Sequence, residues 1–133
     1  MTIRSIVPRE LDYYYSNWQM SPGLACGDFI YMTGFTGSDR NGDVPADPET
    51  QFRSAFRKIG LVLAEAGLTY NSLVEMTSYH VGLRDHLELF KKVRSEFVVE
   101  PYPAWTAIEV AGFVAEKAVV EIKAVARRQS HSG

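Results

Sequence analysis

The sequence has very little cysteine, no surplus of positive charge and no long apolar run. Cys26 is the only cysteine among 133 residues, so no disulfide can form within the chain and a reducing cytoplasm is the expected location. The formal net charge is −2, which offers a phosphate backbone no general attraction, so no nucleic-acid partner is expected. The apolar runs are too short to span a bilayer and the first residues lack a signal-peptide core, so no membrane association is expected.

The composition that remains is that of one folded domain. The chain is 46% hydrophobic and 23% charged, which excludes an intrinsically disordered or low-complexity protein. A chain of this length is expected to form a single domain over residues 1–133. Its last residues, 129–133, are small and polar and are expected to be a disordered tail.

Turn and cap residues predict a hairpin and a helix in the first half of the chain. Two β-prone runs flank Gly27-Asp28, which is typical of a hairpin turn. Asp47 can cap the free amides of a helix, and Gly67 is typical of a left-handed helix end. The pattern therefore predicts a helix over 48–66. Apolar residues at helical spacing form its buried stripe: Phe52, Phe56, Ile59, Leu63 and Ala66.

The second half of the chain is typical of a strand, a helix and two more strands. A strand is predicted over 72–81, a helix from near Asp85, and strands over 104–110 and 118–127. Strands and helices in this order indicate an α+β fold, in which a mixed β-sheet carries two helices packed on one face.

The last predicted strand has two different faces. One face can pack under the helices, because its residues are all apolar: Val120, Ile122, Ala124 and Ala126. The opposite face is part apolar and part charged: Val119, Glu121, Lys123 and Val125. Two helices cover only one face of a sheet, so the other meets water or a second subunit, and its valines favour a subunit.

Few familiar catalytic motifs are present. There is no Gly-rich phosphate loop between a strand and a helix and no Gly-x-Ser-x-Gly nucleophile motif. His80, His86 and His131 lack the spacing of metal ligands, so no metal site is expected.

An ordered set of short patterns is more informative. These patterns are Ala25 to Gly34, Ala64 to Leu68, Pro103 to Ala111 and Val120 to Ala126. In this order and at these intervals the chain resembles the RidA (YjgF) family of enamine/imine deaminases over roughly residues 20–127. The resemblance implies a chorismate-mutase-like subunit and a homotrimer with ligand clefts between neighbours. It also implies hydrolysis of a small-molecule enamine or imine to a carbonyl compound and ammonia, without a metal or organic cofactor.

The resemblance also assigns residues to the expected cleft. Glu121 matches the family's catalytic Glu and would activate the attacking water. Thr33, which precedes Gly34, keeps the hydroxyl of the family's Ser-Gly pair. Backbone groups at Thr106 and Ala107 would line the cleft as in relatives.

Trp105 is the main departure from the family pattern, because it stands where relatives carry a substrate-clamping Arg. An indole has one donor and no charge, so it cannot hold a carboxylate as a guanidinium does. It can stack on a planar ligand or attract an iminium cation. We therefore expect substrate choice to shift from small imino acids towards bulkier or more planar imines. Lys91, near the family's second-helix Asn, is a candidate replacement cation.

Each of these residues also has a structural interpretation. Trp105 can be a packing residue in a closed or non-catalytic cleft, and Glu121 can pair with Lys123 or with a basic residue of a neighbouring subunit. The aromatic cluster Tyr13–Tyr15 and Trp18 either folds over the cleft and forms an aromatic-walled pocket with Trp105, or covers the core edge or a subunit seam. A non-catalytic trimer that binds a metabolite or a protein is therefore the alternative function.

Overall fold

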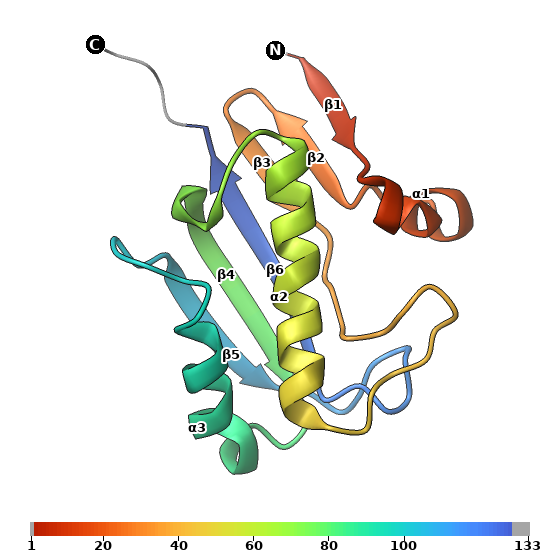
Figure 1. Cartoon of the computed structure of the whole chain (residues 1–133), viewed down its shortest axis with the longest axis vertical. Coiled ribbons are helices and arrows are strands. Elements are labelled where there is room, and N and C mark those ends of the chain that lie inside the picture. The colour runs from red at the N-terminus through yellow and green to blue at the C-terminus, as the bar shows by residue number, and fades with distance from the viewer. Residues whose placement is uncertain (1, 129–133) are drawn as a thin grey trace.

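The computed structural model describes residues 2–128, which form one six-stranded mixed sheet with its two longer helices on one side (Figure 1). The strands are β1 (Ile3–Ile6), β2 (Gly23–Cys26), β3 (Phe29–Met32), β4 (Leu73–His80), β5 (Ala104–Glu109) and β6 (Val120–Arg127). The helices are α1 (Asp12–Trp18), α2 (Pro48–Glu65) and α3 (Leu83–Arg94), with short 3₁₀ turns at Arg9–Leu11 and Tyr70–Ser72. The strand order is β1-β2-β3-β6-β4-β5, and only β4 and β5 are parallel neighbours. The expected tail, 129–133, lies outside the described residues.

The predicted hairpin, helices and strands are present, with small shifts at their ends. Gly27 has a φ of 61° at the turn between β2 and β3, as the hairpin prediction requires. Helix α3 begins at Leu83, two residues before the predicted start. The reason lies in β5, where the Glu109 carboxylate accepts hydrogen bonds from the amides of Gly82 (3.0 Å) and Leu83 (2.7 Å).

Two N-terminal elements were not predicted. Strand β1 has four residues, of which three are exposed, and helix α1 has only seven residues. Elements this short produce no clear apolar period, so the hydropathy pattern does not reveal them. In Figure 1, α1 lies beyond the edge of the sheet on its β1 side.

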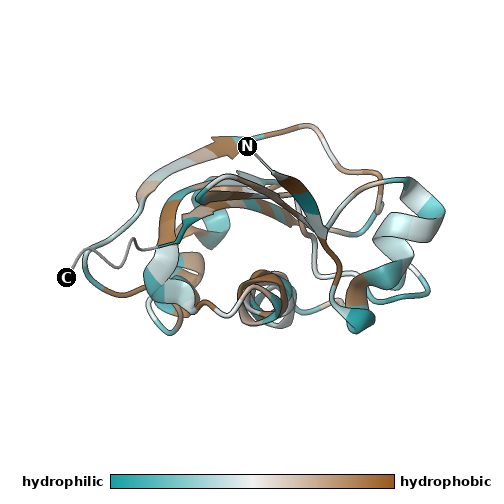
Figure 2. Ribbon diagram, turned by 90° about the horizontal axis from the view of Figure 1, so that it is seen from above, coloured by the Kyte–Doolittle hydropathy of each residue, from teal (hydrophilic) through white to brown (hydrophobic). Residues whose placement is uncertain are grey.

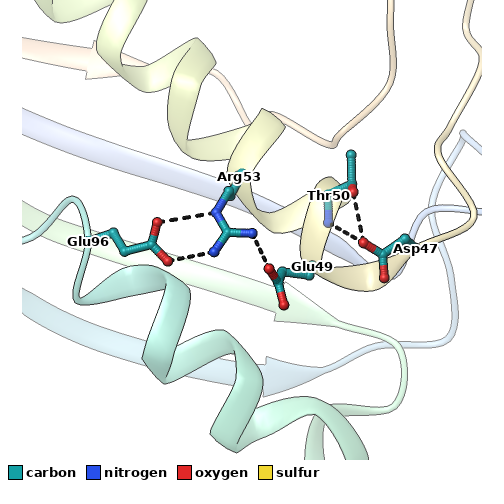
Figure 3. Close-up of polar contacts among 5 residues, drawn as sticks. All are labelled: Asp47, Glu49, Thr50, Arg53 and Glu96. Carbon is teal, nitrogen blue, oxygen red and sulfur yellow. Dashed lines mark hydrogen bonds and ion pairs between the residues drawn. The ribbon is translucent and has the colours of Figure 1, made fainter.

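Helix α2 is fixed at its start by side-chain contacts (Figure 3). The Asp47 carboxylate accepts hydrogen bonds from the amide (3.1 Å) and the hydroxyl (2.8 Å) of Thr50, which is the predicted N-cap. Arg53 in the next turn pairs with Glu49, and also with Glu96 just beyond α3 at 2.6 Å. This ion-pair network ties the two longer helices together at the surface.

The two faces of the sheet differ as predicted. On β6, the apolar face beneath the helices is at most 3% exposed: Val120, Ile122, Ala124 and Ala126. Figure 2 shows α2 and α3 on one side of the curved sheet and no helix on the other. That outer face carries Phe29, Tyr31 and Ile108, which are between 39% and 50% exposed. Among the described residues, no helix is both long and apolar enough to cross a membrane.

Candidate active site

A cavity of about 510 Å³ lies between α1, the segment that follows β3, and the start of β6. Glu121 and Gly34 contribute to its wall, and α1 contributes the aromatic rings of Tyr13, Tyr14 and Trp18. The cavity therefore combines the Glu121 carboxylate with aromatic surface, and Asp39 and Arg40 also contribute to its wall.

The carboxylate of Glu121 is held close against Gly34. Backbone hydrogen bonds in both directions join Phe35 to Ile122, at 2.8 and 2.9 Å, and they set the residue before Phe35 against Glu121. A Cβ atom added at Gly34 would lie only 2.5 Å from Glu121 Oε2. The carboxylate thus occupies space that only a glycine leaves open.

Glu121 is half-buried, and this desolvation raises the pKa of its carboxyl above the ordinary value of a glutamate. A carboxylate of raised pKa is a stronger base than an ordinary glutamate. This side chain can therefore take a proton from a water molecule and later return it to a leaving group.

Thr33 lies in the same cavity wall as Glu121. Its amide donates to the Pro22 carbonyl (3.1 Å), and its hydroxyl donates to the sulfur of Met20 (3.4 Å). Met20 also lines the cavity. A thioether is a weak acceptor, so the Thr33 hydroxyl can exchange this contact for a ligand.

Tyr14 and Lys58 form a polar pair behind the cavity that the sequence patterns did not reveal. Lys58 is only 7% exposed, and its ammonium donates to the Tyr14 hydroxyl (2.9 Å) and to the Thr36 carbonyl (2.8 Å). Burial lowers the pKa of Lys58 to about 8 and raises that of Tyr14 well above the ordinary value of a phenol. One signal was available, since Lys58 has helical spacing from the buried residues Ala55 and Val62.

Trp105 lies on the opposite, helix-covered side of the sheet. It is in register with Met76, its indole N–H donates to the Ser78 hydroxyl (2.8 Å), and its ring centroid lies 5.8 Å from that of Phe90. The guanidinium of Arg94 stacks 4.4 Å from the indole. Within one subunit the structure therefore does not bring Trp105 to Glu121, and the indole's donor and one face are already engaged.

The other predicted residues also lie away from the cavity. Thr106 is exposed on β5, and Ala107 is in register with the buried Ser78. Lys91 is exposed on α3, where its ammonium lies 3.8 Å from the carboxylate of Glu88. Of the expected site residues, the subunit brings together only Glu121 and Thr33.

The N-terminal aromatics line the cavity and cover the core edge, but Trp105 does not share this pocket with them as expected, because it packs against Phe90. Tyr13 and Tyr14 are at most 8% exposed and pack into the core edge, yet both line the cavity. Trp18 lines it too but is 56% exposed, and Tyr15 is 53% exposed. Among the described residues, no cluster of three or more His, Cys, Asp or Glu is placed to hold a metal ion.

A family model described as endoribonuclease L-PSP matches residues 15–128 of this chain. The chain belongs to that family. It is the RidA (YjgF) family, and the resemblance in the sequence patterns is confirmed. The chorismate-mutase-like α+β fold of the family is confirmed with it.

Two Escherichia coli relatives illustrate the range of similarity within the RidA family. The RutC family protein YjgH is 32% identical over 127 residues, which is 92% of this chain and 93% of YjgH. A solved structure of a YjgH protein has a TM-score of 0.88 and covers 98% of this chain and 100% of that one. TdcF, which carries an assignment as a reactive intermediate deaminase, is 25% identical over 112 residues, 81% of this chain and 85% of TdcF. The RidA structure from an Antarctic Psychrobacter species, at 23% identity and a TM-score of 0.78, shares the fold; the match covers 96% of this chain and 99% of that one.

Proposed function

We propose that this chain hydrolyses reactive enamines or imines to carbonyl compounds and ammonia in the Glu121 cavity. The observation that carries the proposal is the half-buried Glu121 carboxylate, which packs against Gly34 in an aromatic-walled cavity. Membership of the RidA family and the deaminase assignment of TdcF support the same reaction.

In the proposed reaction the Glu121 carboxylate acts twice, first as a general base and then as a general acid. The Glu121 carboxylate takes a proton from water as the water oxygen bonds to the imine carbon, the π electrons move to nitrogen, and the nitrogen takes a proton from solvent to give a neutral carbinolamine. The carbon–nitrogen bond of the carbinolamine then breaks, Glu121 returns its proton to the nitrogen, which leaves as ammonia, and the hydroxyl proton returns to solvent to leave the carbonyl compound. General base and acid catalysis of this kind contributes typically about 10²–10⁴-fold to the rate.

Substrate choice in this proposal follows from the absence of a free guanidinium in the cavity and from its aromatic walls. Position 105 supplies no guanidinium, and the guanidinium of Arg40 in the cavity wall is already paired with Asp12 at 2.8 Å. A substrate carboxylate would have to compete with that pair. The aromatic walls instead favour planar or apolar imines, and iminium cations can rest against the ring faces.

We also propose that the subunit assembles as a homotrimer through the outer sheet face. Phe29, Tyr31 and Ile108 are too large and too exposed there to be typical of a water-facing sheet. In such an assembly a neighbour would complete the cavity, and Thr106, exposed on the same face, would approach a neighbouring site.

The placement of Trp105 favours a second candidate function, a trimer that binds a metabolite or a protein without turnover. The family's substrate-clamping Arg is absent, and Trp105 in its place packs against Phe90 of α3. A cavity of this kind can still bind a ligand through its aromatic walls.

An ammonia-release screen decides between the two functions. Freshly generated aliphatic, aromatic and cyclic imines are incubated with the wild type, with Glu121→Gln, and with Glu88→Gln as a matched control at a side chain that is 87% exposed. The proposal expects catalytic ammonia release by the wild type and Glu88→Gln and a loss of roughly 10²-fold or more in Glu121→Gln. Ligand binding without ammonia release across the whole panel would establish the binding module instead.

A further inference from the structure

The buried pair of Tyr14 and Lys58 has no role in the reaction as written above, although Tyr14 shares a cavity with Glu121. Resting on the proposed function, we propose that Lys58 supplies a proton, through the Tyr14 hydroxyl, to the nitrogen of the substrate. Tyr14 would be the catalytic residue that touches the substrate, and Lys58 a positioning and proton-relay residue behind it.

The hydrogen bonds fix the direction of this relay. An ammonium group has only donors, and Lys58 directs two of them to the Tyr14 oxygen (2.9 Å) and the Thr36 carbonyl (2.8 Å). The Tyr14 oxygen therefore accepts from Lys58, and its own hydrogen must point elsewhere. The Tyr14 hydroxyl is also hydrogen-bonded to the side chains of Tyr13 and Ser38, which both belong to the cavity wall. The Tyr14 O–H is directed to Tyr13 in the wall of the cavity that Glu121 also lines, and it reaches a substrate nitrogen by exchanging this contact.

The ring of Tyr14 is held in place by packing. It is 7% exposed and meets Phe35 edge to face, with ring centroids 5.4 Å apart. Phe35 is the residue whose backbone pairs with Ile122 of β6. The same segment therefore positions both Glu121, through Gly34, and the phenol that shares its cavity.

With this relay the proton balance of the reaction is complete. As water attacks, Glu121 takes a proton from the water, the imine nitrogen takes the Tyr14 proton, and Lys58 replaces that proton on the Tyr14 oxygen. As the carbinolamine collapses, Glu121 protonates the departing nitrogen, and the hydroxyl proton returns through Tyr14 to Lys58. One imine and one water give one carbonyl and one ammonia, and every group regains its starting state.

The charge state of Lys58 gives the relay a pH dependence. Burial lowers the pKa of Lys58 to about 8, and Asp39 opposes this shift. Above that pH a neutral amine has no proton to give and can accept the Tyr14 hydrogen instead, which turns the hydroxyl away from the cavity. The titratable or charged groups around Lys58 and Tyr14 are Tyr13 and Glu121 in the cavity wall, and Glu10, Asp39, Arg40, Asp43 and Arg57 beside the second cavity that Lys58 lines.

The test is a set of pH profiles of ammonia release on an imine that the wild type turns over. Tyr14→Phe keeps the buried ring and removes the hydroxyl, with the exposed Tyr15→Phe as its control. Lys58→Met keeps the length of the side chain and removes its proton, with the exposed Lys92→Met as its control. Circular dichroism and thermal unfolding verify that each variant is folded.

We expect Tyr14→Phe to lower kcat by roughly 10²-fold with KM changed by less than about threefold, because the hydroxyl acts in the transition state. Lys58→Met is expected to lower kcat and to abolish a fall in wild-type activity centred near pH 8. Lys58→Arg, for which the adjoining cavity of about 490 Å³ offers room, keeps the charge but releases no proton and is expected to stay slow.

Three results would overturn the relay. The first is a kcat of Tyr14→Phe or Lys58→Met within about threefold of the wild-type kcat while Glu121→Gln is inactive. That result would overturn the relay alone and would leave the proposed deaminase function standing. The second is a wild-type profile with no alkaline fall near pH 8, or a fall that persists in Lys58→Met. The third is full recovery of kcat in Lys58→Arg, which would assign Lys58 a positioning role alone. A wild type inactive on every imine would overturn both proposals.

Discussion

The close contact between Gly34 and Glu121 allows the position of the carboxylate to be tested without changing the carboxylate itself. In Gly34→Ala the new Cβ would lie 2.5 Å from Glu121 Oε2 and 2.8 Å from its Cδ, whereas ordinary contacts are 3.4–4 Å. The glutamate side chain must therefore move by roughly 1 Å. Displacement of a catalytic group by that distance costs on the order of 10² in rate.

The same substitution is expected to cost little stability. Gly34 is not among the glycines of positive φ, so alanine can adopt its backbone conformation. Glu121 borders a cavity of about 510 Å³ into which its carboxylate can turn. The free energy of unfolding is expected to fall by only about 1 kcal/mol, at the low end of the range for a residue that overfills its site.

The assay compares kcat for ammonia release with urea unfolding for the wild type, Gly34→Ala and Gly112→Ala. Gly112 is a matched control, because a Cβ there meets nothing within 4 Å and its φ is not positive. We expect a loss of about 100-fold in kcat for Gly34→Ala and none for Gly112→Ala. A Gly34→Ala enzyme with wild-type kcat and intact dependence on Glu121 would refute the claim that this contact positions the catalytic carboxylate.

Three further predictions concern stability and assembly. Because burial raises the pKa of Glu121, the folded state favours its protonated form; that stabilisation is present at acid pH and is lost as the pH rises through the raised pKa. In urea unfolding, the free energy of unfolding of Glu121→Gln should therefore rise relative to that of the wild type from acid to neutral pH. A difference between the two proteins that stays constant with pH would contradict the raised pKa of Glu121. Trp105→Arg should lower the free energy of unfolding by about 2–4 kcal/mol, because it removes packing on Phe90 and the hydrogen bond to the buried Ser78. It should not create activity on carboxylate-bearing imines. A stable variant that gains such activity would show that position 105 reaches the site. Tyr31→Glu on the outer face should convert the proposed trimer to monomers by sedimentation, and a wild-type monomer at micromolar concentration would exclude the trimer itself.

Much of the fold could be predicted because local signals agree with the tertiary structure. Asp47 caps α2 as its type and position predicted, and the alternation along β6 separated the helix-covered face from the outer face. The start of α3 could not be placed, because Glu109 caps it from a strand distant in the sequence. Contacts of this kind are set by the fold and leave no local pattern.

The candidate site was predictable only in part, for the same reason. Glu121 and Thr33 follow from the family pattern and line the cavity. The direction of Trp105 depends on the parallel register of β5 with Met76 on β4, which no single-strand pattern specifies. Lys58 was missed because a lysine on an amphipathic helix usually faces water, whereas here the first helix brings a phenol over its ammonium.

The most direct test of the central claim is the initial rate of ammonia release from one accepted imine by the wild type and by Glu121→Gln at the same neutral pH and equal concentrations of folded protein. The account predicts catalytic release by the wild type and a rate at least about 100-fold lower for Glu121→Gln. Equal rates for the two proteins would contradict it, because the carboxylate in the aromatic-walled cavity would then have no part in the hydrolysis.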